Sequence, residues 1–384
     1  MPKNWKTYKL GNLCIKITDG AHHSPKDIGT GGYPMPSVKD LTPFGLNLKS
    51  SKRISELDYY KLIKQGCQPI VNDVVIAKDG NSALDTVCII KKKIEAVLLS
   101  SVAIIRPDMK LIDPYFLKCY FSSPAILKYL KSRFISGAAI PRVILKDFKL
   151  AEINLPPLPE QKAIASILSA IDDKIENNLA MNKTLEDMAM ALYQHWFVDF
   201  GPFKEGKFID SELGLIPEGW QVKPIGDVID TVGGGTPKTK TKEYWEDGTI
   251  NWYSPTDLTK SNSLYSNKSA KKITSLGLQK SSARLFPKGS LLMSSRATIG
   301  ALTINRKEAC TNQGFITMIP NENVCVYQLH GWAVDNMNLI ISKANGSTFK
   351  EISKTNFRAL PILTGAKIKE YKLEVSNSYK KIES

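Results

Sequence analysis

The longest regular pattern of hydrophobic and polar positions in the chain covers residues 155–200. Its entry holds Pro156, Pro157 and Pro159, which suits a helix start because proline lacks an N–H and has a fixed φ. No proline or glycine interrupts the rest of the stretch. A mostly apolar series, which we call the seam, recurs there at alternating spacings of four and three, the period of a coiled coil. The seam consists of Ile164, Leu168, Ile171, Ile175, Asn178, Asn182, Leu185, Ala189, Leu192 and Trp196.

This pattern predicts one helix, which at 1.5 Å per residue would be roughly 60 Å long. Helices of globular domains are usually shorter, so we expect a spacer between two folded bodies. A long core helix of a single domain is the alternative. Asn178 and Asn182 fall on the seam. Polar residues at such positions often fix helix register at a cost in stability.

The residues before this helix, 1–154, combine strand-like and helix-like patterns. Apolar, β-branched runs of strand length cover 71–76, 87–90 and 97–105. Residues 115–134 instead carry apolar side chains at helical spacing. Loops rich in turn-forming residues occur between these segments. We therefore expect a mixed α/β first domain and an α+β chain.

The pattern repeats in the second half of the chain. The sequence PEGW at 217–220 echoes PKNW at 2–5 with an offset of 215. Farther on, residues 286–295 echo residues 70–79 with an offset of 216. Offsets of this size far exceed the period of solenoid repeats. The chain is therefore predicted to hold two similar domains.

The repeat divides the chain into five expected segments. These are a first domain at 1–154, the long central helix at 155–200, a linker at 201–216, a second domain at 217–360 and a short C-terminal helix at 361–384. The C-terminal helix has its own apolar positions at helical spacing. They are Ile368, Tyr371, Val375, Tyr379 and Ile382.

This duplicated organisation resembles the specificity subunit of type I restriction–modification systems. The resemblance covers essentially the whole chain and is carried by the sequence LPPLPEQKAIASIL after the first domain and by PEGW at the start of the second. It implies two target recognition domains joined by long helices that pair antiparallel as a coiled coil. It also implies a subunit without a catalytic site that reads a bipartite, asymmetric DNA target.

The same resemblance implies a set of partners. Methylation and restriction subunits would gather around this chain on double-stranded DNA. S-adenosylmethionine, ATP and Mg²⁺ would then be bound by those partner subunits, and this chain would hold no cofactor. The methylation subunit would flip the target base, because a methyltransferase cannot reach its target atom inside a duplex.

Composition agrees with a nucleic-acid partner. The net charge is +15 and the pI is near 9.3, as expected for a protein that binds a polyanion. A lysine-rich solvated surface would give the same numbers. Six cysteines are scattered without a CxxC pair, and the start of the chain lacks an apolar signal-peptide core. No apolar run is long enough for a membrane span, so we expect a cytoplasmic protein without disulfides.

Motifs for catalysis are incomplete. An amino-methyltransferase needs Asn-Pro-Pro-aromatic, whereas residues 154–158 read NLPPL. Residues 201–207 fit the first seven positions of a phosphate-binding loop, but Phe208 replaces the hydroxyl that would bind Mg²⁺. The adjacent His22 and His23 lack metal-ligand spacing with the cysteines, so no metal site is predicted. A catalytic nuclease or methyltransferase, or a scaffold that binds nucleic acid nonspecifically, are the alternative functions.

Candidate DNA contacts lie in loops after the expected strands. Base edges are read by Arg, Lys, Asn and Gln, and carboxylates accept from cytosine. Residues 312 and 313 fall near residues 100 and 101 under the repeat, so this position differs between the domains, as two different half-sites require. The candidates are Lys39, Lys78, Asn81, Arg142, Lys238, Lys240, Arg296, Asn312 and Gln313.

The second copy departs from the family pattern at the C-terminal helix. It reads LPILTGAK where the first copy reads LPPLPEQK, and fewer residues follow. The helix pair is therefore expected to be short or lopsided. The seam from Leu185 to Trp196 is then expected to face the second domain, a partner or another copy of the chain.

Overall fold

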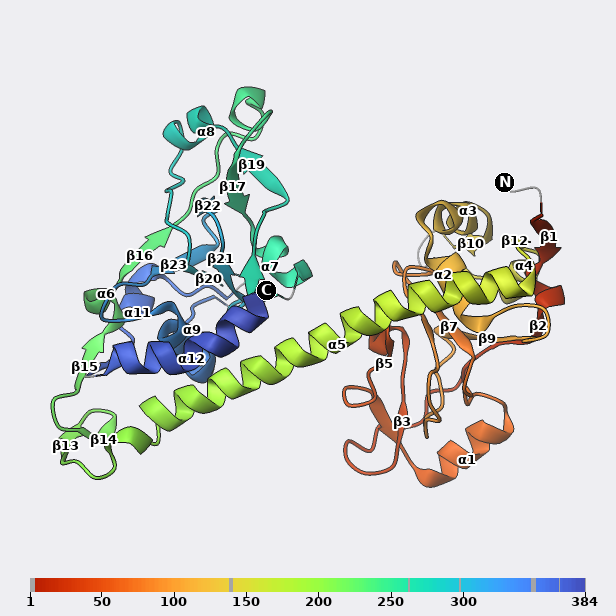
Figure 1. The fold of residues 1–384 in the computed structure, drawn as a ribbon, viewed down its shortest axis with the longest axis horizontal. Coiled ribbons are helices and arrows are strands. Elements are labelled where there is room, and N and C mark those ends of the chain that lie inside the picture. The colour runs from red at the N-terminus through yellow and green to blue at the C-terminus, as the bar shows by residue number, and fades with distance from the viewer. Residues whose placement is uncertain are drawn as a thin grey trace. The chain divides into compact units, whose positions relative to one another are not determined.

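The computed structural model describes residues 4–137, 141–261, 263–296, 298–346, 350–365 and 367–383. It divides into two compact units, unit 1 at Met1–Asn178 and unit 2 at Leu179–Ser384. Unit 1 is coloured red to yellow-green in Figure 1, and unit 2 green to blue. Helix α5, Leu158–Phe197, is continuous over 40 residues and contributes turns to both units. The structure thus confirms the predicted long helix and its end in each of two bodies.

Unit 1 is built on a four-stranded antiparallel sheet. Its strands in spatial order are β2 (Cys14–Asp19), β9 (Val102–Pro107), β7 (Val74–Ala77) and β8 (Val87–Ile89). Every residue of β7 is buried, as expected for a central strand that packs on both faces. Helix α2, Pro114–Ser122, packs against β7 and β8.

A two-stranded ladder closes unit 1 beside α5. Strand β1 (Lys6–Lys9) pairs antiparallel with β12 (Glu152–Leu155), so the chain enters and leaves the unit on neighbouring strands. The remaining elements of unit 1 are η1 (Leu10–Leu13), β3 (Tyr33–Met35), η2 (Val38–Asp40), β4 (Leu41–Thr42), β5 (Gly45–Leu46), β6 (Lys52–Ile54), α1 (Glu56–Lys64), α3 (Pro124–Phe134), β10 (Ile135–Ser136), β11 (Arg142–Val143) and α4 (Leu145–Phe148).

Three expected segments of unit 1 have different bounds in the structure. The helical pattern at 115–134 forms two helices, because Ser123 is extended and Pro124 begins α3. A residue before proline is driven out of the helical region by the proline ring. The strand expected at 71–76 begins only at Val74, because Asn72 has a φ of 73° in a turn. The strand expected at 97–105 begins only at Val102, after a turn at residues 100–101, and ends at Pro107.

Unit 2 repeats the sheet of unit 1. Its strands in spatial order are β16 (Asp230–Gly233), β23 (Phe315–Ile319), β20 (Leu291–Ser294), β21 (Leu302–Asn305) and β18 (Tyr265–Ser266). The first four pair antiparallel in the same order as β2, β9, β7 and β8. Strand β18 is an additional parallel edge strand. The predicted duplication is therefore present in three dimensions.

The entry ladder is repeated as well. Strand β15 (Gln221–Pro224) pairs antiparallel with β24 (Pro361–Thr364), so unit 2 extends past the expected boundary at 360. The remaining elements of unit 2 are η3 (Gly201–Phe203), β13 (Phe208–Ser211), β14 (Gly214–Pro217), α6 (Ile225–Val228), η4 (Lys242–Tyr244), β17 (Ile250–Tyr253), α7 (Pro255–Ser261), β19 (Lys271–Ile273), α8 (Ser275–Gln279), β22 (Ala309–Thr311), α9 (Val326–Asp335), α10 (Met337–Ser342), α11 (Lys354–Arg358) and α12 (Ile368–Glu383).

Residues 201–216 are not the plain linker expected from the sequence. They form η3 and most of a β-hairpin made by β13 and β14, in which Gly214 has a φ of 91°. The ring of Phe203 packs edge-on against Trp220 with a centroid distance of 5.0 Å. Aromatic burial on unit 2 gives this short segment a fixed structure that its polar, glycine-containing sequence did not indicate.

The seam of α5 divides into two parts. From Leu185 to Trp196 it turns toward unit 2: Leu185 is buried, and Ala189 and Trp196 belong to the core of that unit. From Ile164 to Asn182 it is largely exposed, and Ile171 is 53% exposed. Ile164, at the start of the seam, packs against the core of unit 1, which otherwise contacts the helix through Gln161 and the acids described below.

The C-terminal helix α12 pairs with the second part of the seam. The ring of Tyr371 lies 5.7 Å from Trp196 and 4.9 Å from Phe197. Toward the other end of α12, the charge of Glu186 acts on Tyr379, so the two helices run antiparallel. Ile368, Val375 and Tyr379 are buried in the same core. The short pair expected from the sequence is therefore present within unit 2.

Candidate nucleic-acid interface

Three of the predicted DNA contacts meet in one pocket of unit 2. The pocket has a volume of about 270 Å³ and is lined by Arg296, Asn312 and Gln313, together with Thr256 and Thr259 of α7. Arg296 follows the end of β20, while Asn312 and Gln313 join β22 to β23. Adjacent ends of neighbouring strands thus bring together side chains that are apart in the sequence. A pocket with guanidinium, amide and hydroxyl groups can read hydrogen-bonding edges.

Hydrogen bonds hold the polar groups of this pocket in place. Thr236 Oγ1 donates to Gln313 Oε1 at 2.7 Å, and the Gly314 N–H donates to Asn312 Oδ1 at 2.9 Å. Gly234 allows this close approach of two loops, because a Cβ there would lie 2.1 Å from the carbonyl oxygens of Thr311 and Asn312. The amides therefore sit on a close-packed backbone.

A carboxylate orients the arginine of the pocket. Arg296 donates from Nε to Glu351 Oε2 at 2.9 Å, and its Nη2 lies 2.8 Å from the same oxygen. The arginine side chain remains 50% exposed. A guanidinium fixed on one edge and exposed on the other is ready for a planar, bidentate contact.

The predicted contacts Lys238 and Lys240 lie on the loop after β16, and both are exposed. Trp245 Nε1 donates to the Lys238 carbonyl at 3.2 Å, and Trp252 Nε1 donates to the Gly235 carbonyl at 2.9 Å. Thr236 of the same loop reaches Gln313, so this basic loop borders the pocket. Lysines in such a place suit phosphate contacts, which fix position rather than sequence.

In unit 1 the predicted contacts surround the matching strand ends. Lys39 is exposed on η2, which is tied to the loop before β9 because the Val38 N–H donates to Ser101 Oγ at 3.1 Å. Asn81 is exposed in the turn after β7. Arg142 is exposed and forms a backbone bridge to Asp79 at the end of β7. These residues share one edge of the sheet.

Lys78 has a different environment from the one expected. Its side chain is only 10% exposed, and its Nζ donates to Asp19 Oδ2 at 2.8 Å. A second carboxylate oxygen, Asp79 Oδ1, lies 3.7 Å away. The ammonium is thus neutralised inside the unit, which favours a structural role for Lys78 over the DNA contact predicted for it.

Polar side chains of unit 1 and of the first turns of α5 form hydrogen bonds with one another. Gln161 is buried and accepts from the Asp113 N–H at 2.9 Å. Asp172 accepts from Tyr115 Oη at 2.5 Å and from Lys118 Nζ. Burial acts to raise the pKa of Asp172, but these two hydrogen bonds outweigh it and lower the pKa.

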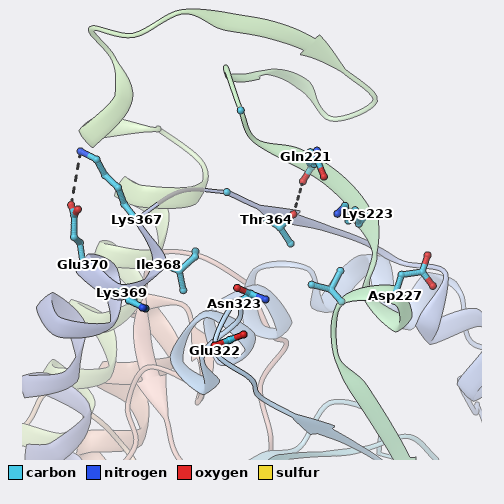
Figure 2. A pocket seen from close by; sticks show the side chains of 13 residues that line it. Gln221, Lys223, Asp227, Glu322, Asn323, Thr364, Lys367, Ile368, Lys369 and Glu370 are labelled. Atoms are coloured by element: carbon cyan, nitrogen blue, oxygen red, sulfur yellow. Dashed lines mark hydrogen bonds and ion pairs between the residues drawn. The ribbon is translucent and has the colours of Figure 1, made fainter.

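Figure 2 shows a larger cavity of unit 2, with a volume of about 680 Å³. It lies between the β15–β24 ladder and the start of α12, and Thr364 Oγ1 donates there to the Gln221 carbonyl at 3.3 Å. Lysines and acids alternate along its wall, and Lys367 lies 3.9 Å from Glu370. None of the residues predicted to contact DNA lines it. Its mixed charge does not favour a polyanion.

The described residues form neither a candidate metal centre nor a membrane-spanning helix. Within 4–137, 141–261, 263–296, 298–346, 350–365 and 367–383, no group of three or more His, Cys, Asp or Glu side chains is placed to hold a metal ion. In the same part of the chain, no helix has the length and apolar character needed to cross a membrane.

Comparison with known families adds to this geometry. The family model described as the type I restriction modification DNA specificity domain matches the chain twice, at residues 2–187 and 217–366. The chain belongs to this family. Each match contains the sheet of one unit, and the first extends along α5 to residue 187, so each unit holds one specificity domain.

Individual relatives carry the same description. The chain is 34% identical over 177 residues to the type I restriction enzyme MjaIX specificity subunit of Methanocaldococcus jannaschii, covering 46% of this chain and 41% of the relative. It is 22% identical to the HindI specificity subunit of Haemophilus influenzae, covering 71% and 72% of the two chains. Among solved structures, the type I restriction–modification S subunit from M. genitalium shares the fold, with a TM-score of 0.55, 15% identity and coverage of 99% and 92%.

The specificity domains contain polar residues that sequence reasoning did not single out. Glu351 orients Arg296, and Asp79 occupies the end of β7. Thr236, Thr256 and the neighbouring Thr259 add hydroxyls around the second pocket. The basic composition of the chain points to lysine and arginine rather than to these carboxylates. The repeat offered the missing signal, since it aligns Asp79 with the region of Arg296.

Proposed function

We propose that this chain is the sequence-reading subunit of a type I restriction–modification complex. Each specificity domain reads one half of a bipartite, asymmetric DNA target. The observation that carries the proposal is the duplicated sheet, whose equivalent strand ends present unlike polar side chains in the two units. One backbone framework with two sets of side chains suits two different half-sites.

In this proposal, other subunits cut and methylate the DNA. The chain reads DNA without cutting or methylating it and uses no cofactor of its own, while methylation and restriction subunits supply S-adenosylmethionine, ATP and Mg²⁺ chemistry. The incomplete catalytic motifs of the sequence support this assignment. Labelled S-adenosylmethionine with the purified chain and DNA provides the test. Methyl transfer by the chain alone would overturn the proposal.

The exposed part of the seam is the proposed docking surface for the methylation subunit. Leu168, Ile171 and Ile175 are 37%, 53% and 44% exposed along one side of α5. Apolar rows of this kind usually mark interfaces. Changing both Ile171 and Ile175 to Asp should reduce co-purification with the methylation subunit, whereas Lys174→Ala, an exposed change in the same turn, should not.

Methylome sequencing tests the reading function directly. A host that carries this gene and its methylation partner should show one bipartite methylated motif that disappears when this gene is deleted. Replacing residues 217–364 by the equivalent domain of a relative should change only one half of the motif. A swap that changes both halves would contradict independent reading. Binding without sequence preference at raised salt would favour a nonspecific scaffold instead.

A further inference from the structure

The two units present the same backbone at the ends of their central strands. In unit 1 the Lys78 N–H donates to the Ser101 carbonyl at 2.8 Å. In unit 2 the Ser295 N–H donates to the Gly314 carbonyl at the same distance of 2.8 Å. The residues just after Lys78 and Ser295, and those just before Ser101 and Gly314, therefore occupy equivalent places. This equivalence rests on hydrogen bonds rather than on sequence similarity.

The charges at these equivalent places are reversed. Asp79 follows β7 and forms a backbone bridge with Arg142. Arg296 follows β20 and forms a backbone bridge with Glu351 in the same antiparallel sense. The acid and the base have thus exchanged strands between the two units. The Arg296–Glu351 bridge also carries a side-chain ion pair, and the exchange reverses the charge that each central strand offers to a ligand.

Unit 2 offers hydrogen-bond donors. Glu351 binds one edge of the Arg296 guanidinium and leaves the side chain half-exposed. The side-chain oxygens of Asn312 and Gln313 already accept hydrogen bonds from Gly314 and Thr236, so each amide presents its NH₂ group. The base edge that matches several donors is the major-groove edge of guanine, where N7 and O6 both accept.

Unit 1 offers an acceptor at the matching position. The Asp79 side chain is 22% exposed. Its Oδ1 is buried without a hydrogen-bond partner within the described residues and lies 3.7 Å from Lys78 Nζ, so the exposed part of the carboxylate is what this position offers to a ligand. Lys78 makes its short contact with Asp19 instead, at 2.8 Å. Ser100 stands where unit 2 has Gln313, so the long amide donor is missing here. A carboxylate accepts from the exocyclic amino group of cytosine or adenine.

We propose that this charge reversal determines which bases the two units read. Arg296 reads a guanine in the half-site of unit 2, and Asp79 reads an amino-bearing base, cytosine or adenine, in the half-site of unit 1. The inference rests on the proposed function. It goes beyond that function by naming one position in each half-site and the class of base found there.

The test selects bound sequences from a pool of randomised DNA duplexes, using the full chain together with its methylation subunit. The wild-type protein should enrich a two-part motif. Arg296→Ala should lower the preference for one guanine about tenfold to a hundredfold and leave the other half unchanged. Arg296→Lys keeps the charge without the planar fork, so it should keep affinity and still lose most of that preference. Asp79→Ala should relax one cytosine or adenine in the opposite half.

Lys288→Ala is the matched control, because Lys288 is an exposed cation that precedes β20 whereas Arg296 follows it. It should leave the motif unchanged. The half of the motif that a variant still enriches also serves as a folding control, because only a folded protein can read it. An unchanged motif in Arg296→Ala, or both variants affecting the same half, would overturn the inference alone. A wild-type protein that enriches no motif would overturn the proposed function as well.

Discussion

Helix α5 is held by two chemically different attachments. Its first turns are held by unit 1 through small apolar contacts of Ile164 and Ala165 and through a row of ionic and amide hydrogen bonds. The polar row consists of Gln161, Asp172, Asp173 and Glu176. Its last turns are buried in unit 2 among aromatic rings, including Trp196. The two attachments respond to different conditions, because ion pairs weaken with salt whereas aromatic burial does not.

The difference indicates which attachment is permanent. Burial of large rings is the principal source of stability in a core, while partly exposed ion pairs contribute little. The end of α5 is therefore an integral part of unit 2. Its beginning is attached to unit 1 by contacts that can be weakened one at a time. Four predictions, ordered by expected effect, test this contrast.

Trp196→Ala should have the largest effect. It removes a ring that is 5% exposed and a hydrogen bond of 2.8 Å from Nε1 to Glu374. Loss of a buried tryptophan costs about 3–5 kcal/mol, so the free energy of unfolding of unit 2 should fall by about that amount. Tryptophan fluorescence in urea provides the measurement, because five of the six tryptophans lie in unit 2. A decrease in the free energy of unfolding of less than about 1 kcal/mol would mean that the two attachments of α5 do not differ as described.

Acid should weaken unit 2 through His330. This residue is buried on α9, its Nδ1 lies 2.8 Å from Tyr379 Oη, and burial lowers its pKa from 6.5 to about 4. In the unfolded chain the His330 imidazole binds a proton near pH 6.5, whereas in the folded chain it binds one only near pH 4. Stability should therefore be fully present above pH 6.5 and fall by about 3 kcal/mol toward pH 4.

His330→Gln is the control for this pH dependence. Glutamine can hydrogen-bond to Tyr379 but does not titrate, so the difference between variant and wild type should follow the loss below pH 6.5. Urea unfolding at a series of pH values measures it. Parallel profiles for the two proteins would exclude His330 as the titrating group.

Lys118→Met should loosen the beginning of α5 by an intermediate amount. The Lys118 side chain is 9% exposed and bonds to Asp172, which would keep its hydrogen bond from Tyr115. Hydrogen bonds to charged groups contribute about 1.5–3 kcal/mol, so hydrogen exchange in residues 165–178 should accelerate while unit 2 stays unchanged. Lys128→Met, an exposed change on α3, is the control. Equal exchange in the two variants would contradict the ionic attachment.

Lys91→Ala should have the smallest effect. Lys91 Nζ lies 2.8 Å from Asp173 and 2.7 Å from Glu176, and these side chains are 36%, 56% and 43% exposed. Such pairs contribute about 0.2–1 kcal/mol, and salt screens them. The destabilisation should therefore be visible by hydrogen exchange at low ionic strength and vanish near 1 M salt. A salt-independent loss would indicate packing by the lysine stem instead.

Much of the fold could be predicted from the sequence because it depends on long patterns. The period of the seam extends over many turns, and the helix it predicted runs from Leu158 to Phe197. The duplication was visible in short echoes that share one offset, and the two sheets confirm it. The predictions that were wrong concern local structure. A break before Pro124 and a hairpin after Gly201 depend on single residues and on rings that lie elsewhere.

At the candidate site, contacts between residues far apart in the sequence limit prediction even more. Side-chain chemistry marks Arg296, Asn312 and Gln313 as candidate base contacts, and the structure places them around one pocket. Whether they contact DNA stays a prediction. The contact of Lys78 with Asp19 joins residues 59 positions apart, and Arg296 is 55 positions from Glu351. No periodic pattern reports such pairs, so neither the burial of Lys78 nor the orientation of Arg296 could be anticipated.

The ladders of β1 with β12 and of β15 with β24 have an evolutionary consequence. Each places the beginning and the end of a whole domain on adjacent strands. Two crossovers in a gene, one at each strand, would then exchange a complete reading module and leave the helix that receives it intact. New combinations of half-sites can arise in a single recombination event, without intermediates that fold poorly. A lineage with such a gene can change the DNA it recognises faster than point mutation allows.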